Sequence, residues 1–158
     1  MKAVTPLQRE LRQRRPFPST AQECVVALLR TTDLMRRQTA VVVEALGITA
    51  QQFNVLRILR GGGDDGLPTL EVADRMVEQT PGVTHLLDRL EAKGLVRRQR
   101  CPRDRRQHLC WITPRGLELL AARDAPVMKA AQESLKGLSV RDQSELIRLL
   151  DAIRAAHQ

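Results

Sequence analysis

The segment between residues 69 and 94 constrains the fold more than any other part of the chain. Its sequence, TLEVADRMVEQTPGVTHLLDRLEAKG, predicts a short helix over 69–77, a turn near residue 78 and a longer helix over 80–93. The longer helix has apolar residues at helical spacing, which predicts one buried stripe made of Val83, Leu86, Leu87 and Leu90. Two helices joined by a tight turn in this way are typical of a helix-turn-helix.

A basic hairpin follows directly. Residues 95–100 and 107–112 are predicted to be its strands, with a tip at 101–106. Six arginines lie in this region, namely Arg97, Arg98, Arg100, Arg103, Arg105 and Arg106. A two-stranded ribbon is marginally stable by itself, so it must lean on the neighbouring helices. A helix-turn-helix followed by such a ribbon has the element order of a winged helix-turn-helix, and this order is the informative feature.

The face of the longer helix opposite the apolar stripe is polar and partly basic. It carries Thr84, His85 and Arg89, and Thr80 and Pro81 mark the predicted start of the helix. Hydroxyl, imidazole and guanidinium groups can meet base edges or phosphates in a major groove, and a helix N-terminus favours a phosphate. Many amphipathic helices have an outer face of this kind. The helix alone therefore does not distinguish a DNA reader from an ordinary solvated surface.

The whole chain is predicted to be mainly α-helical, with about six helices and the hairpin as its strand pair. Caps and apolar periodicity place the helices at 20–46, 50–60, 69–77, 80–93, 114–136 and 139–156. The predicted N-caps are Thr20, Thr49, Thr69, Thr80, Thr113 and Ser139. A kink or break is expected at Pro126, because proline removes a helical hydrogen bond. The basic segment 1–18 is predicted to be an extended, mobile tail.

Positive charge is concentrated in two places. The chain carries a net +8, residues 1–18 hold five basic groups against one acid, and residues 79–106 hold eight against three. A local excess of this kind suits an anionic partner, with a solvated basic surface as the alternative. Aromatic side chains, on which single-stranded bases stack, are limited to Phe17, Phe53 and Trp111, so the partner is expected to be a duplex.

Two further features bear on where the chain works. No apolar run approaches the ~20 residues of a membrane span, and residues 2–16 are too polar for the apolar core of a signal peptide. The expected location is the cytoplasm.

Two stretches resemble the MarR family of bacterial transcriptional regulators. They are VTHLLDRLEAKGLVRR at 83–98 and PRDRRQHLCWITPRG at 102–116, with an Asp-x-Arg pattern at 104–106 and a T-x-x-G pattern opening the next helix. The resemblance implies a single domain over 19–158. In it, 48–113 form the winged helix-turn-helix, and the helices of 19–47 and 114–158 form a dimerisation region.

The resemblance also implies a function. A homodimer would bind a pseudo-palindromic duplex operator as a repressor that a small-molecule ligand releases, with release by an oxidant as the alternative. The chain departs from the family pattern at Cys101, where wings often begin with an acid, and at His85, which is commonly a stronger base. The effector, the operator sequence and the choice between repression and activation are left open.

The hairpin tip supplies the remaining predicted contacts. Arg106 is expected to enter the minor groove, because a guanidinium suits a narrow and strongly negative groove. Asp104 is expected to hold it by a charge-assisted hydrogen bond. Arg103 and Arg105 would then contact phosphates. With Thr80, Pro81, Thr84, His85 and Arg89, these residues make up the predicted DNA-binding set.

Other function classes receive less support. The histidines, His85, His108 and His157, have no nucleophile or acid partner nearby in sequence, so no enzyme and no cofactor is expected. Cys101, His108 and Cys110 lack a fourth ligand and the spacing of a zinc module, so no metal is expected. Cys24, early in the first helix, is a candidate redox sensor, with a buried cysteine acting as a small hydrophobe as the alternative. A winged module that binds protein is the third class, and the basic wing argues against it.

Overall fold

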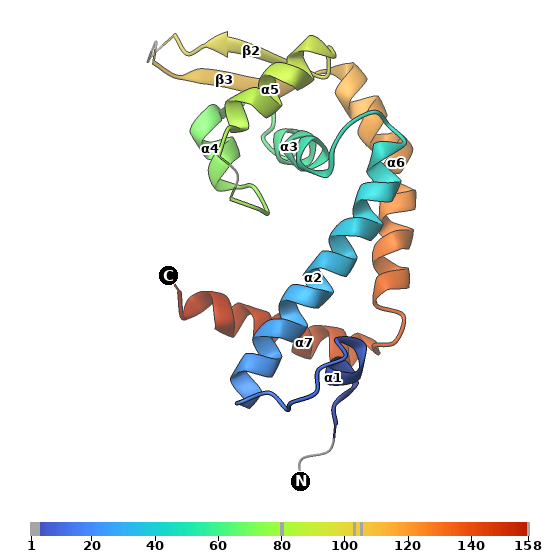
Figure 1. Cartoon of the computed structure of the whole chain (residues 1–158). Coiled ribbons are helices and arrows are strands. Elements are labelled where there is room, and N and C mark those ends of the chain that lie inside the picture. The colour runs from blue at the N-terminus through green and yellow to red at the C-terminus, as the bar shows by residue number, and fades with distance from the viewer. Residues whose placement is uncertain (1–3, 80, 103, 105, 158) are drawn as a thin grey trace. The chain divides into compact units, whose positions relative to one another are not determined.

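The structure is a computed structural model that describes residues 4–79, 81–102, 104 and 106–157. The chain divides into two compact units, Met1–Gln38 and Thr39–Gln158, and helix α2, Thr20–Glu44, runs through the division. Figure 1 labels the elements. Within the described residues, every helix is too short or too polar to cross a membrane.

The first unit holds α1, Pro6–Glu10, and the first part of α2. The expectation of an extended segment is wrong here, because α1 is a short helix with a complete capping box at Thr5. α2 begins at Thr20 as predicted, but its cap is Ser19, whose hydroxyl accepts from the backbone N–H of Gln22 at 3.1 Å. The predicted cap is therefore displaced by one residue.

The second unit contains the helix-turn-helix, the hairpin and two long helices. Its elements after α2 are α3 Ala50–Arg60, β1 Leu67–Pro68, α4 Thr69–Asp74, α5 Val83–Ala92, β2 Val96–Arg100, β3 His108–Ile112, α6 Pro114–Ser134 and α7 Val140–Ala155. All six predicted helices are present, and Thr49, Thr113 and Ser139 cap their helices as predicted.

Two local expectations are wrong, and of the kink or break expected at Pro126 the break is excluded. α5 begins at Val83 rather than near Thr80, because Gly82 adopts φ +95° and acts as its N-cap. Pro68, not Thr69, is the cap of α4. α6 is not broken at Pro126 but runs through it.

The sheet has three strands where the sequence predicted two. The predicted hairpin is confirmed, with β2 antiparallel to β3 from the Val96–Ile112 pair to the Arg100–His108 pair. β1 adds to the other edge of β3, opposite Cys110 and Leu109. Two residues cannot show the alternation that predicts a strand, so only the pairing with β3 reveals β1.

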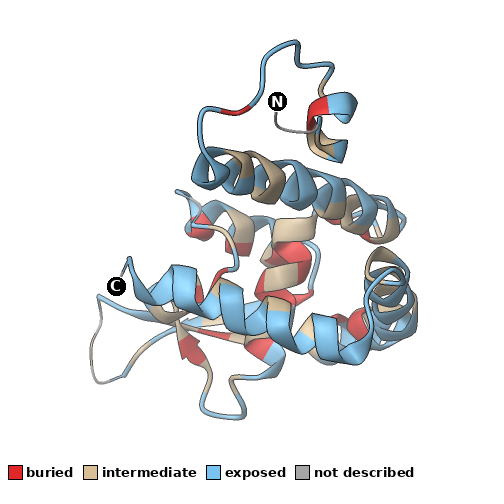
Figure 2. Ribbon diagram, turned by 90° about the horizontal axis from the view of Figure 1, so that it is seen from below, coloured by how far each residue is buried: buried red, intermediate tan, exposed pale blue. Residues whose placement is uncertain are grey.

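The core lies beneath the helix-turn-helix and the sheet. Leu56, Leu87, Leu90, Leu120, Val43, Val55, Val72 and Cys110 are its largest fully buried side chains. They come from α2, α3, α4, α5, β3 and α6, and Figure 2 shows the buried positions gathered inside the fold. The predicted stripe on α5 is confirmed, since Val83, Leu87 and Leu90 are buried and Leu86 is partly buried. The core therefore fixes which face of α5 points outward.

Candidate nucleic-acid interface

Helix α5 presents the polar face that the sequence predicted. Thr84, His85 and Arg89 are exposed, and the His85 side chain retains 85% of its accessible surface. Pro81 is exposed in the turn before the helix. Thr80 lies outside the described residues. The exposed residues follow from the buried stripe, because a helix anchored along one face offers the opposite one to solvent.

The turn before α5 is fixed from below. The backbone N–H of Val77 donates to Oδ1 of Asn54 at 2.9 Å, which ties the end of α4 to helix α3. At the other end of α5, the ammonium group of Lys93 donates to the backbone carbonyl of Gly47. The segment before α5 is therefore held by a polar contact to α3, and the C-terminal end of α5 is held by a polar contact to the turn after α2.

Arg98 connects the hairpin to α5. Its backbone N–H donates to Oε1 of Glu91 at 3.0 Å, and its guanidinium donates to Oε2 of Glu91 at 2.7 and 2.9 Å and to Oδ1 of Asp88 at 2.5 Å. We call this contact set the Arg98 brace. Burial lowers the pKa of Arg98, but the hydrogen bonds that it donates to Glu91 and Asp88 outweigh burial and raise the pKa above its ordinary value. The brace also neutralises two carboxylates on a helix expected to face DNA.

Asp88 has a second neighbour. Nδ1 of His85 lies 3.6 Å from Oδ2 of Asp88, so a protonated His85 would pair with the same carboxylate as Arg98. The outer face of α5 thus carries a small network of His85, Asp88 and Arg98, in which Arg98 already pairs with the Asp88 carboxylate. Asp88 is exposed on this face, and its partner Arg98 comes from β2, ten residues along the chain.

The hairpin tip is organised by Asp104. Its Oδ1 accepts from the backbone N–H of Arg106 at 3.0 Å, and its Oδ2 accepts from Nε2 of Gln107 at 3.1 Å. The backbone N–H of Gln107 donates to the carbonyl of Asp104 at 3.0 Å, which closes the turn. Asp104 does contact Arg106, but through the backbone N–H of Arg106 and not through the charge-assisted bond to its guanidinium that was predicted. The reason is local, because an Asp side chain readily accepts from the N–H two residues later.

The arginines of the hairpin divide into two groups. The Arg97 guanidinium stacks over the ring of Trp111, 4.0 Å from its centroid, and Arg98 forms the brace. These two are structural. Arg100 and Arg106 are exposed. Arg103 and Arg105 lie outside the described residues. The sequence showed the number of arginines, but only the fold shows that Arg97, although exposed, stacks on Trp111 and that Arg98 is engaged by α5.

Trp111 is held from its other side by the glycine-rich loop. Its indole N–H donates to the backbone carbonyl of Asp64 at 2.8 Å. A Cβ on Gly66, where φ is +71°, would lie 2.4 Å from the Trp111 ring. The stretch GGGDDG is therefore needed for a close approach that supports β3, the central strand of the sheet, a role that the sequence did not reveal.

The T-x-x-G pattern has a packing explanation. The Thr113 hydroxyl accepts from the N–H of Gly116 at 3.1 Å and donates to the carbonyl of Gly94 at 2.8 Å. A Cβ on Gly116 would lie 2.5 Å from the backbone oxygen of Leu95. The start of α6 is thereby locked to the beginning of the hairpin.

The cysteines occupy different surroundings. Cys24 is exposed on α2, so in a single chain it does not behave as a buried hydrophobe. Cys110 is buried, and burial raises the pKa of its thiol, which makes it a poor nucleophile. Across residues 4–79, 81–102, 104 and 106–157, no cluster of three or more His, Cys, Asp or Glu side chains could hold a metal ion.

An exposed polar helix beside a basic ribbon, both on a helix-turn-helix, defines the class of winged helix DNA-binding proteins. The model of the MarR family matches residues 46–107. A MarR transcription factor from Planctomyces limnophilus is 37% identical, the match covers 87% of this chain and 99% of that chain, and the TM-score is 0.67. The chain belongs to the MarR family, whose members are DNA-binding transcriptional regulators and not enzymes.

Two further solved structures share the fold. Sco3205, a MarR family transcriptional regulator from Streptomyces coelicolor solved in complex with DNA, is 22% identical, with 92% of this chain and 94% of that chain covered and a TM-score of 0.79. BpsR from Bordetella bronchiseptica, whose DNA binding is regulated by 6-hydroxynicotinic acid, is 24% identical, with 84% and 98% covered and a TM-score of 0.74.

Proposed function

We propose that the chain is a dimeric repressor that reads a pseudo-palindromic operator with α5 in the major groove and the hairpin tip against the minor groove. The observation that carries the proposal is the exposed face of α5, fixed by the core below and by the Arg98 brace beside it. A reading helix must be rigid, because a misplaced side chain loses the geometry of a base contact.

The proposed contacts follow from position and chemistry. Thr84 and His85 contact base edges, while Pro81 and Arg89 lie near the DNA backbone at the groove entrance. Thr80, which lies outside the described residues, is proposed to contact a phosphate. Arg106 enters the minor groove from a turn that Asp104 closes, and Arg103 and Arg105 contact phosphates. Asp104 itself is a positioning residue.

The dimer is proposed from apolar side chains that a single chain leaves uncovered. α7 has no buried residue. Its side chains Ile147, Leu149 and Ile153 are 59%, 45% and 46% exposed, respectively. Met128 of α6 and Val41 of α2 are 60% and 73% exposed. Apolar surface of this extent marks an association surface. A two-fold dimer would place two α5 helices about 10 base pairs apart on the operator.

The operator contacts are tested by footprinting followed by titration in a salt series. Thr84→Ala and His85→Ala should alter sequence preference, each by about 1–3 kcal/mol of discrimination at one base pair. Arg106→Ala should weaken operator and non-operator binding alike and flatten the salt dependence by about one unit of slope. Gln132→Ala, exposed on α6, is the matched control. A footprint with one unrepeated half-site contradicts the dimeric mode.

A small-molecule ligand is proposed as the releasing signal. Its support is a relative of the same fold, BpsR, whose DNA binding responds to 6-hydroxynicotinic acid. That compound is the first probe, titrated into the operator complex. Release at ligand concentrations that leave the fold intact supports ligand control, and a complex unaffected by it removes this compound as the effector.

Cys24 offers a second signal, because its thiol is exposed on α2. Peroxide treatment of the wild type and of Cys24→Ser separates the two signals. Loss of operator binding in the wild type alone would favour an oxidant over a ligand.

A further inference from the structure

The basic N-terminal segment, residues 4–18, is folded by contacts of its own. The Gln8 side chain is only 5% exposed, and it accepts from the N–H of Thr5 at 3.0 Å while donating to the carbonyl of Arg15 at 3.2 Å. Phe17 is 8% exposed. A buried amide with both ends bonded and a buried ring are features of an ordered segment rather than of a loose tail.

The chain reverses direction immediately after α1. Arg12 adopts φ +52°, a left-handed conformation that is uncommon for a residue other than glycine. The backbone N–H of Gln13 then donates to the carbonyl of Gln8 at 3.0 Å. The reversal brings the extended stretch 13–16 back beside α1.

The charge of this segment is largely unneutralised within the described residues. The acid of this segment, Glu10, forms an ion pair with Arg30 of α2, in which Oε1 of Glu10 accepts from Nε of Arg30 at 2.7 Å. Four exposed arginines remain, and across the described part of the chain none of them has an acidic partner: Arg9, Arg12, Arg14 and Arg15. A folded segment with four free guanidinium groups is an electrostatic footprint for an anion.

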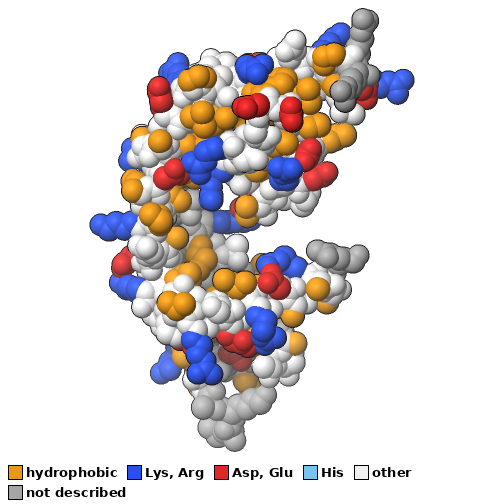
Figure 3. Space-filling view, turned by 180° about the vertical axis from the view of Figure 1, so that it is seen from behind, with side chains coloured by type: hydrophobic (Ala, Val, Ile, Leu, Met, Phe, Trp, Pro, Cys, Tyr) orange, Lys and Arg blue, Asp and Glu red, His pale blue; other side chains and the backbone are white. Residues whose placement is uncertain are grey.

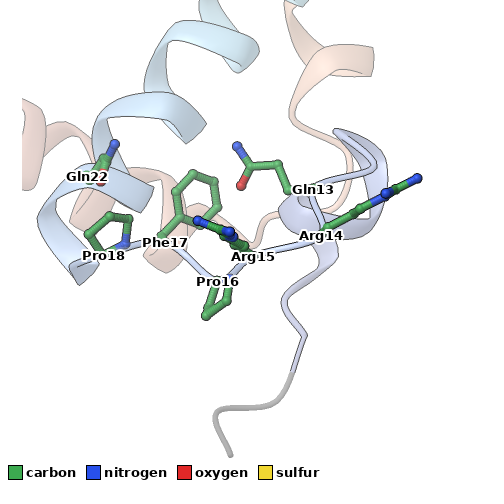
Figure 4. A pocket seen from close by; sticks show the side chains of 7 residues that line it. All are labelled: Gln13, Arg14, Arg15, Pro16, Phe17, Pro18 and Gln22. Atoms are coloured by element: carbon green, nitrogen blue, oxygen red, sulfur yellow. The ribbon is translucent and has the colours of Figure 1, made fainter.

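A shallow hollow lies at the centre of this segment (Figure 4). It is lined by Gln13, Arg14, Arg15, Pro16, Phe17, Pro18 and Gln22. In the view the Arg14 side chain extends away from the other lining residues, while Arg15 lies between Phe17 and Gln13. The guanidinium groups of Arg14 and Arg15 therefore do not converge on one point.

We propose that this folded segment, the N-terminal arm, is a second DNA-binding surface that contacts the phosphate backbone outside the bases read by α5. Arginines spread over a helix, a turn and an extended stretch suit a linear polyanion. A single carboxylate or phosphate group would engage only one or two of them. The proposal rests on the proposed DNA binding by α5 and the hairpin, and adds a sequence-independent term to it.

A membrane surface fits the N-terminal arm less well. An interfacial helix needs an apolar face to bury, but α1 has five residues and its exposed neighbour Val4 stands alone, because Leu7 and Leu11 are half-buried and Phe17 is buried. Stacking on nucleic-acid bases is also excluded as the main contribution to binding by the arm, because its aromatic ring, Phe17, is buried.

The test is a charge-removing variant of the full chain, Arg9→Gln, Arg12→Asn, Arg14→Gln and Arg15→Gln. Asparagine is used at Arg12 because it tolerates the left-handed conformation, and Gln8, Glu10 and Phe17 are left intact to preserve the fold. The control variant removes four exposed charges elsewhere, with Arg37, Lys129, Lys136 and Arg141 each changed to Gln. Circular dichroism and light scattering establish that both variants keep the fold and the assembly state of the wild type.

Binding is measured against salt on three duplexes: a minimal operator, the same operator with flanks of about one helical turn on each side, and a non-operator sequence. The arm variant should lose about two to four units of slope in log K against log salt on the flanked and non-operator duplexes, since each phosphate contact contributes about 0.9. Its loss on the minimal operator should be smaller. The control should stay within one unit of the wild type throughout.

Equal slopes for the arm variant and the control overturn the proposal. So does an arm variant that loses binding to phosphatidylglycerol vesicles while keeping the wild-type slope on DNA. These outcomes differ from a failure of the proposed function, in which the wild type itself would not distinguish the operator from other DNA.

Discussion

At the scale of single residues, the negative charge of Asp104 disfavours DNA binding, whereas its hydrogen bonds in the hairpin tip favour it. Removing an acid beside DNA should strengthen binding by simple electrostatics, but this carboxylate closes the hairpin tip by accepting from Arg106 and Gln107. We therefore predict that Asp104→Ala weakens operator binding about five-fold, the equivalent of one hydrogen bond of about 1 kcal/mol. A titration at fixed salt measures it, with Asp104→Asn as the conservative comparison. Tighter binding by the alanine variant would refute the positioning role.

Gly66 is the residue where close packing and backbone conformation coincide. We predict that Gly66→Ala destabilises the fold by more than about 1 kcal/mol, because it combines a left-handed φ of +71° with a Cβ only 2.4 Å from Trp111. Gly63→Ala is the control, since its φ is +68° and nothing lies within 4 Å of its Cβ. Thermal unfolding followed by the fluorescence of the single tryptophan compares the two. Equal losses would mean that the ring contact does not matter.

At the scale of elements, the Arg98 brace joins β2 to α5. We predict that Arg98→Met lowers stability by about 1 kcal/mol and weakens DNA binding more than that loss explains, because Asp88 and Glu91 are left as uncompensated acids near DNA. Arg75→Met is the control, because Arg75 pairs with Glu71 on the same short helix and joins no two elements. Glu91→Gln combined with Arg98→Met should recover part of the binding. No recovery would place the effect in packing rather than charge.

At the scale of the whole molecule, the uncovered apolar side chains decide whether the chain is stable alone. Figure 3 shows apolar side chains at the surface among the charged ones. We predict that the wild type is dimeric and that its unfolding midpoint rises with concentration, because the folded monomer lacks cover for α7.

Leu149→Glu together with Ile153→Glu should abolish the dimer and lower the unfolding midpoint, because each places a charge on the apolar stripe of α7. Ala155→Glu, on the opposite face of the same helix, is the control. Light scattering and thermal unfolding provide the measurement. A compact, fully folded monomer at micromolar concentration would be incompatible with this prediction.

Local chemistry in the sequence determined much of the molecule. Thr49, Thr113 and Ser139 cap their helices through hydroxyls that accept a nearby N–H, a contact that needs no tertiary structure. The stripe of α5 follows from helical spacing alone, and so does the polar face opposite it. The hairpin follows from two arms around a short basic turn, whereas its register is known only from the structure. For these reasons the winged helix-turn-helix and the exposed residues of α5 could be predicted.

Only the tertiary structure decided what depends on pairs of residues distant in sequence. β1 is a strand because β3 offers it an edge, and Gly66 matters because Trp111, far along the chain, lies against it. Arg97 and Arg98 resemble the other arginines of the hairpin until a ring and two carboxylates engage them. Such contacts contribute free energy only when two distant segments come together, so the sequence of either segment alone shows no pattern that predicts them. Periodicity and caps set the elements, and the contacts between them selected which charges remain free for DNA.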